Sequence, residues 1–97
     1  MVQQTLQINQ QEFKATKLTT EHCSILLIQG QKGNLGCGYF SIGPAEKMGD
    51  RFAIVSGVKN FDDMLSAVVL AASSTAIAAG VKVGESTGKE ALLLMEQ

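Results

Sequence analysis

Residues 64–81 contain no ionisable side chain, and this uncharged stretch constrains the fold more than any other feature of the sequence. Asn60 is a favoured helix N-cap, two aspartates follow it in the first turn, and Gly80 suits the position just after a helix end. We therefore predict one long helix over residues 61–79. A helix that is apolar or small on every side is typically buried, so we expect this one to pack between its own sheet and a neighbouring copy of the chain.

A membrane-spanning helix is the competing interpretation, because about 18 uncharged residues reach the minimum length of a span. The centre of the stretch, AASSTA, would gain little from contact with lipid, and the sequence holds only one such stretch. We therefore predict a buried helix and no membrane partner.

Composition also favours self-association. Charged residues make up 18% of the sequence, against roughly 25% in a typical soluble domain, and such a shortage indicates less free surface than a monomer has. The net charge of -1, with no basic run, does not favour nucleic acid as a partner. We expect a single domain, residues 1–97, in a homo-oligomer. No basic leader precedes an apolar run at the N-terminus, so we also predict a cytoplasmic location.

Apolar alternation and continuous apolar runs predict about five strands, which lie at residues 5–9, 13–18, 24–29, 35–40 and 52–58. The glycine-containing segment 30–34 suits a hairpin turn between the third and fourth strands. Short helices are expected at residues 43–49 and after Thr87. The predicted fold class is α+β: an N-terminal antiparallel β-sheet region, one long helix and a short C-terminal helix.

The segment GESTGKEALLLM, residues 84–95, superficially resembles a nucleotide-binding phosphate loop. That loop needs four residues between its glycines and a Ser or Thr after the lysine, whereas here the glycines are separated by three residues and Glu90 follows Lys89. Thr87 and Glu90 instead have the spacing of a capping box that starts a helix. Anion binding at that helix start is the remaining functional alternative.

Gly36 and Gly38 lie two residues apart in a predicted strand, so they leave a strip of bare backbone on one face. Glycine weakens a strand, which indicates that a neighbour needs the space. Either a small-residue helix presses on this strip or a ligand lies against it, so both glycines are candidate ligand-binding residues.

Cys37 and Asp50 are the weak candidates for chemistry. Cys37 is expected to be a buried, inert thiol, and a nucleophilic role would need a base, for which His22 is the only histidine. Asp50, at a turn before a strand, is either a turn-forming residue or part of a polar site. Cys23 and Cys37 have no metal-ligand spacing, so we predict reduced thiols, no metal and no cofactor, although their spacing alone leaves a disulfide open.

Five segments, taken in order, resemble the YunC-like family of small bacterial and archaeal proteins of unknown function: LGCGYF, KMGDRFAIVSGV, DDML, AGVKVG and GKEALLLM. The resemblance implies an α+β domain whose N-terminal β region mediates tetramerisation, and it implies no established activity. Cys37, Gly38 and Asp50 match motif positions of that family.

Two functional hypotheses remain open from the sequence. The first is a homo-oligomeric cytoplasmic protein with a binding or structural role, assembled through its N-terminal sheet. The second is a small enzyme or ligand-binding subunit with a pocket between subunits near Cys37 and Asp50, because subunit borders offer a short chain the concavity that ligands need. An accessory partner of another protein is a weaker third hypothesis. The sequence does not name a ligand.

Overall fold

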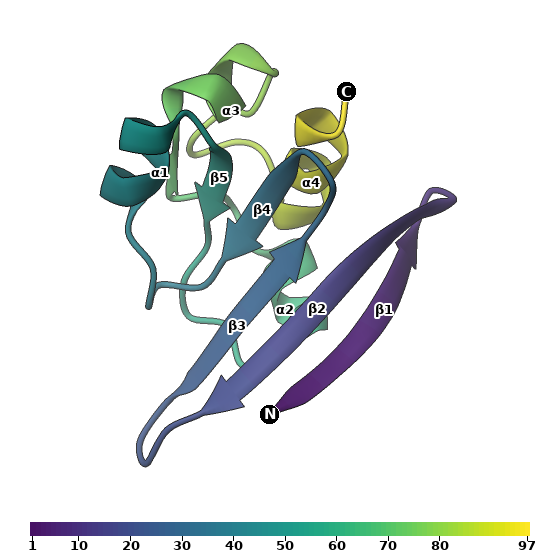
Figure 1. Cartoon of the computed structure of the whole chain (residues 1–97), viewed down its shortest axis with the longest axis vertical. Coiled ribbons are helices and arrows are strands. Elements are labelled where there is room, and N and C mark those ends of the chain that lie inside the picture. The colour runs from purple at the N-terminus through teal and green to yellow at the C-terminus, as the bar shows by residue number, and fades with distance from the viewer.

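Six strands form one sheet in the order in which they occur along the chain (Figure 1). They are β1 (Val2–Ile8), β2 (Gln11–Thr19), β3 (Ser24–Gln29), β4 (Gly33–Gly36), β5 (Arg51–Ile54) and β6 (Ala71–Ala72). Every neighbouring pair is antiparallel except β4 and β5, which are parallel. Four short helices complete the computed structural model, which describes residues 1–97: α1 (Ile42–Met48), α2 (Phe61–Ser66), α3 (Ser74–Ala78) and α4 (Gly88–Met95). The α+β prediction is confirmed.

The N-terminal hairpin follows from period-two alternation and a tight turn. Asn9 and Gln10 join β1 to β2 with positive φ angles of 49° and 67°, a conformation that favours two-residue hairpins. In the resulting register Leu6 lies opposite Phe13, and Phe13 and Ala15 are buried on the same face of β2. The hairpin therefore contributes one face to the core, while most of β1 stays exposed.

β4 is shorter than the strand predicted over residues 35–40. The β3–β4 hairpin is present, with its turn at residues 30–32, but β4 ends at Gly36 and the chain turns at residues 38–39. The amide of Phe40 donates to the carbonyl of Cys37 at 3.1 Å in this turn. The early end has a topological reason, since a parallel β5 beside β4 requires a crossover, and α1 forms it.

The predicted long helix over residues 61–79 is wrong. α2 ends at Ser66, the chain extends to pair Ala71 and Ala72 with β5, and α3 starts only after Ser73. The buried Ser73 hydroxyl explains the break: it donates to the carbonyl of Asp50 at 2.7 Å and accepts from the amide of Phe52 at 3.0 Å. It also accepts from the amide of Ala76 as the N-cap of α3. These tertiary contacts outweigh the helix propensity of the alanines.

The broken segment places apolar side chains on the surface. Val68, Leu70, Ile77 and Val83 are each between 45% and 59% exposed in the single chain. None of the four helices is long and apolar enough to cross a membrane.

The predicted capping box is confirmed and places α4 against the core. The Thr87 hydroxyl accepts from the Glu90 amide at 3.2 Å, and the Glu90 carboxylate accepts from the Thr87 amide at 2.9 Å. Leu92 and Met95 of α4 are fully buried in a core cluster that also contains residues of β2, β3, β4, β5 and α2. The capping box thus starts a core helix.

The C-terminal residues are tied to the β3–β4 turn. The Glu96 carboxylate accepts from the amides of Gln31, Lys32 and Gly33 at 2.9, 2.8 and 3.0 Å. The Arg51 Nη1 donates to the carbonyl of Met95 at 2.6 Å and to that of Gln97. Together these bonds join the end of α4 to the sheet.

Candidate functional site

A cleft of about 390 Å³ lies between the turn after β4, helix α1 and the start of β5. Its lining residues are Tyr39, Phe40, Ser41, Pro44, Ala45, Met48, Asp50 and Phe52. The volume falls in the usual range for small-molecule sites, roughly 300–1,000 Å³. The wall is mainly apolar, and Asp50 is the one residue that both lines the cleft and was predicted as a candidate from the sequence. We treat this cleft as the candidate functional site.

A larger hollow, of about 640 Å³, lies against β1, β2 and β3. Its lining is polar apart from Phe13, and glutamines supply four of the nine residues. It contains none of the predicted site residues. It lies on the projecting N-terminal hairpin and the turn after β3.

Two aromatic rings fill the space beside Gly36. A Cβ atom at this position would lie 2.7 Å from Phe40 Cδ2 and 2.8 Å from Phe52 Cε1. The two ring centroids are 5.7 Å apart and the ring planes meet at 51°, a tilted arrangement that suits aromatic pairs. Gly36 is therefore needed for close packing, and the neighbour is an aromatic pair, neither a helix nor a ligand. Because both rings also line the cleft, the absence of a side chain at Gly36 determines where the aromatic wall of the cleft lies.

Gly38 does not form a common strip of bare backbone with Gly36. It lies in the exposed turn after β4, where a Cβ atom would meet only Ser56, at 3.3 Å from its Cβ. The strand assumed in the sequence-based argument ends before this position, so the two glycines do not form one surface.

Cys37 lies in the hydrophobic core and is 5% exposed. Its Sγ accepts from the amide of Leu26 at 3.3 Å, and its own amide donates to the Leu26 carbonyl at 3.0 Å. It does not line the cleft. This environment favours a structural thiol over a nucleophile.

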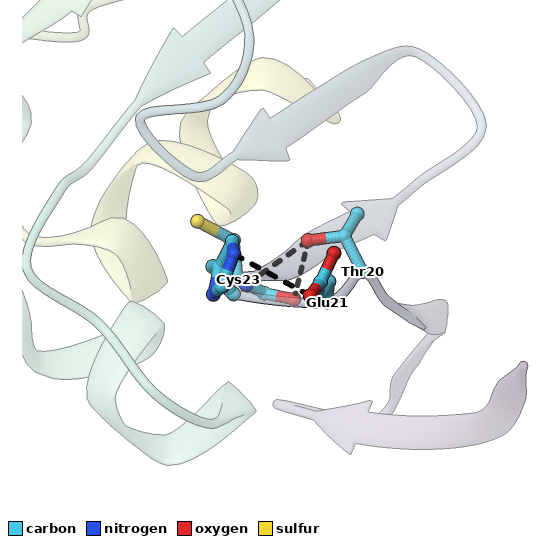
Figure 2. A network of polar contacts seen from close by, with 4 residues as sticks. Thr20, Glu21 and Cys23 are labelled. Carbon is cyan, nitrogen blue, oxygen red and sulfur yellow. Dashed lines mark hydrogen bonds and ion pairs between the residues drawn. The ribbon is translucent and has the colours of Figure 1, made fainter.

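Cys23 and His22 belong to the turn between β2 and β3, which is exposed. The Thr20 hydroxyl closes this turn by accepting from the Cys23 amide at 2.9 Å and donating to the Cys23 carbonyl at 3.1 Å (Figure 2). The Cys23 sulfur points away from these contacts in Figure 2. The His22 side chain, 84% exposed, lies 3.8 Å from the Glu21 carboxylate, so it is not the base for the buried Cys37. Both cysteines are free thiols.

Backbone hydrogen bonds fix the position of Asp50. Its amide donates to the carbonyl of Ala45 at 2.9 Å, next to Gly49, which ends α1 with a φ of 78°. Its carbonyl accepts from the hydroxyls of Ser73 and Thr75 at 2.7 and 2.8 Å. The exposed carboxylate of Asp50 therefore extends from a backbone held on both sides.

Helix α1, which forms one wall of the cleft, is held to the start of α3 by Glu46. The Glu46 carboxylate accepts from both the hydroxyl and the amide of Ser74. These two bonds favour the ionised form and lower the pKa of Glu46 below its ordinary value. In α4, the bond from the Thr87 backbone and then the contact with its hydroxyl lower the pKa of Glu90 in the same direction.

These two lowered pKa values predict a stability that falls in acid. A carboxyl group whose pKa is lower in the folded state stabilises the fold above its unfolded pKa, about 4.3, and this contribution is lost as the pH falls through the folded value. Thermal unfolding of the Glu46→Gln/Glu90→Gln variant at pH values from 7 to 3 should show a smaller fall in melting temperature than the unsubstituted protein. Glu85→Gln, which removes an exposed carboxylate with no hydrogen bond to the chain, should keep the full pH dependence. If the melting temperature of the double variant falls with pH as steeply as that of the unsubstituted protein, the role given to Glu46 and Glu90 is contradicted.

Comparison with known proteins places the chain in a family. Residues 36–95 match the family described as a domain of unknown function, DUF1805. The chain belongs to this family. DUF1805 is the YunC-like family, so the resemblance seen in the sequence is confirmed. The matched region contains every residue that lines the cleft, whereas β1, β2 and β3 lie before it.

A solved structure shows the same fold. It is the crystal structure of a protein of unknown function, TA1206, from Thermoplasma acidophilum, and it aligns with a TM-score of 0.91 at 31% sequence identity. The alignment covers 97% of this chain and 91% of that one. No curated protein matches this chain significantly. This DUF1805 chain thus has an archaeal relative of nearly the same extent.

The aromatic part of the cleft was not predicted from the sequence. Phe40 and Phe52 are twelve positions apart in sequence and meet because α1 crosses from β4 to β5. The available signal was Gly36, whose missing side chain indicated a bulky neighbour without identifying it. The structure gathers no group of three His, Cys, Asp or Glu residues that would hold a metal.

Proposed function

We propose that this protein is a homo-oligomer, assembled through its N-terminal strands into a tetramer, and that it binds a small molecule in the cleft beside Asp50. The observation that carries the assembly is the free edge of β1. This strand is outermost in the sheet, and it lies away from α1 and α3 (Figure 1). An edge strand presents unpaired amides and carbonyls that can pair with another chain.

β1 lacks the features that protect edge strands. Its seven residues, VQQTLQI, include no charge and no proline, and most of them are exposed. Lysine, proline or a bulge is the usual protection against pairing at such an edge. Exposed Val2 and Leu18 on the hairpin add apolar area to the same region. These properties support strand pairing between copies, and the polar hollow on the hairpin offers glutamine side chains for further contacts.

The binding role is supported by the cleft, with its aromatic wall and the carboxylate of Asp50, whose backbone is held by hydrogen bonds. The buried Cys37 does not favour thiol chemistry, so a ligand-binding subunit is preferred to the small enzyme that the sequence left open. The small-enzyme alternative still includes a pocket that two neighbouring subunits form together. We also keep the cytoplasmic location in the proposal, supported by two free thiols.

Light scattering coupled to gel filtration tests the assembly. At micromolar concentration we expect a mass near four times the 10.3 kDa of one chain. The Gln4→Lys/Gln7→Lys variant adds two positive charges to β1, and neither new lysine lies directly opposite a positive charge in the hairpin, because Gln4 lies opposite Ala15 and Gln7 opposite Glu12. We expect this variant to dissociate into dimers or monomers because equal charges would meet at the paired edges.

A matched control adds the same charge elsewhere. Ser66→Lys/Gln97→Lys changes two exposed positions outside the N-terminal strands and should keep the assembly of the unsubstituted protein. A monomeric unsubstituted protein would refute the proposed assembly. If the β1 variant retains its mass with an unchanged melting temperature, the interface does not run through β1.

A further inference from the structure

We infer that the cleft beside Asp50 selects a small organic cation with an apolar body, such as a primary amine on an aromatic or aliphatic group. This rests on the binding role proposed above and does not depend on the assembly. The first observation is the charge of the lining: Asp50 is the only charged residue among the eight that form it. A ligand that uses the whole cleft therefore meets one negative charge and a mainly apolar wall.

The Asp50 carboxylate has no cation of its own in the fold. No lysine or arginine side chain forms an ion pair with it, and the one contact of ion-pair type joins His22 to Glu21 in a different turn. Arg51, the next residue, directs its Nη1 to the carbonyls of Met95 and Gln97 at the end of the chain. The negative charge of Asp50 is therefore available to a ligand.

The aromatic residues strengthen the preference for a cation. Tyr39 is 61% exposed, and the Phe40 and Phe52 rings stand as a tilted pair on the same wall. The face of an aromatic ring attracts a cation through its quadrupole. Met48, 75% exposed, supplies a polarisable thioether at the rim.

The site is fixed before any ligand arrives. Close packing on Gly36 holds the two phenyl rings, and hydrogen bonds with Ala45, Ser73 and Thr75 hold the backbone of Asp50. A site that is already ordered loses less conformational freedom on binding. The held backbone places the Asp50 side chain beside the aromatic surface, which selects ligands whose ammonium group and apolar body are close together.

Other ligand classes fit this lining less well. A carboxylate or phosphate would meet the negative Asp50 with no lysine or arginine in the wall. A divalent cation needs several oxygen, nitrogen or sulfur ligands, and this cleft supplies one carboxylate. A neutral apolar molecule would leave the carboxylate unused. An ammonium group attached to an apolar body uses both parts of the site.

Two probes of the same shape test the inference: benzylamine, which is a cation at pH 7, and benzyl alcohol, which is neutral. Amide chemical shifts of the ¹⁵N-labelled protein, followed at low salt, give both affinities and the binding position. We expect millimolar binding of benzylamine with shifts concentrated at residues 39–52, and affinity for benzyl alcohol lower by at least about fivefold. Equal affinities, or shifts centred elsewhere, would overturn the inference.

Substitutions separate the charge from the wall. Asp50→Asn should lower benzylamine affinity about fivefold and leave benzyl alcohol binding unchanged, so that only the smaller preference due to the aromatic rings stays. Asp62→Asn, which removes an exposed carboxylate on α2 outside the cleft, should change neither affinity. A benzylamine affinity that Asp50→Asn leaves unchanged would refute the role of Asp50. If both probes bind equally well at residues 39–52, the cleft still binds ligands but the cation class is wrong.

Discussion

Gly88→Ala is expected to destabilise the protein by about 3 kcal/mol or more, although alanine is normally the better helix residue. A Cβ atom at Gly88, the first residue of α4, would overlap the carbonyl oxygen of Met64 and lie 2.8 Å from Leu35 Cδ2. Both neighbours belong to the packed interior, and one of them is backbone, so neither can move cheaply. The Gly88 amide also donates to the Ala67 carbonyl at 2.8 Å, which fixes α4 at this distance from α2.

Gly43→Ala provides the matched control in another helix. Gly43 lies in α1, and a Cβ atom there would meet nothing within 4 Å. Urea unfolding should therefore show Gly43→Ala to lie within about 0.5 kcal/mol of the unsubstituted protein, because the smaller entropy loss of alanine is offset by crowding of its Cβ against Pro44. If Gly88→Ala proves as stable as Gly43→Ala, α4 does not approach α2 as closely as described here.

Ser73→Ala is expected to remove about 3 kcal/mol of stability. The Ser73 side chain is fully buried, and its loss leaves the amide of Phe52 without its hydroxyl partner, a deficit of roughly 1–3 kcal/mol. Loss of the N-cap of α3 adds about 1 kcal/mol. The carbonyl of Asp50 keeps the Thr75 hydroxyl, which limits the damage.

Ser66→Ala is the appropriate control, because Ser66 is exposed at the end of α2 and its side chain makes no hydrogen bond. It should lie within about 0.5 kcal/mol of the unsubstituted protein in the same urea experiment. The Ser73 variant also has a second readout, since Asp50 and Phe52 both line the cleft: its folded fraction should bind benzylamine more weakly. Equal stability of the two serine variants would show that Ser73 does not hold β5 to α3.

The local parts of the fold could be predicted from the sequence, because neighbouring residues determine them. Thr87 and Glu90 stand three positions apart and cap each other, and the turns that join β1 to β2 and β3 to β4 lie where short polar or glycine-containing segments separate apolar runs. The family resemblance added the expectation of an α+β domain, which the structure confirms.

The long helix failed because its alternative depends on partners distant in sequence. Ser73 looks like one small residue among alanines, yet its hydroxyl bonds to Asp50 and Phe52, more than twenty positions earlier. The period of the apolar residues cannot reveal such a contact. Local signs of the break were nevertheless present. Val68 and Val69 are β-branched and favour extended backbone, and Ser73 is a good N-cap for a new helix.

One residue of the candidate site could be predicted from the sequence, but the shape of the cleft could not. Asp50 was identified as a polar residue before a strand, and the structure places it at the cleft. The aromatic wall depends on the parallel pairing of β4 and β5, which no local pattern indicates. Cys37 matched a family motif, and its predicted burial agrees with its place in the core, where it bonds to Leu26 of the neighbouring strand.

The contact between Glu96 and the β3–β4 turn has a consequence for biosynthesis. The carboxylate of residue 96 satisfies three amides of a turn made some 65 positions earlier. The N-terminal strands of the sheet are therefore synthesised well before Glu96, the residue that completes the hydrogen bonding of the β3–β4 turn. Throughout that interval β1 keeps an unpaired edge, before α4 is in place against the sheet.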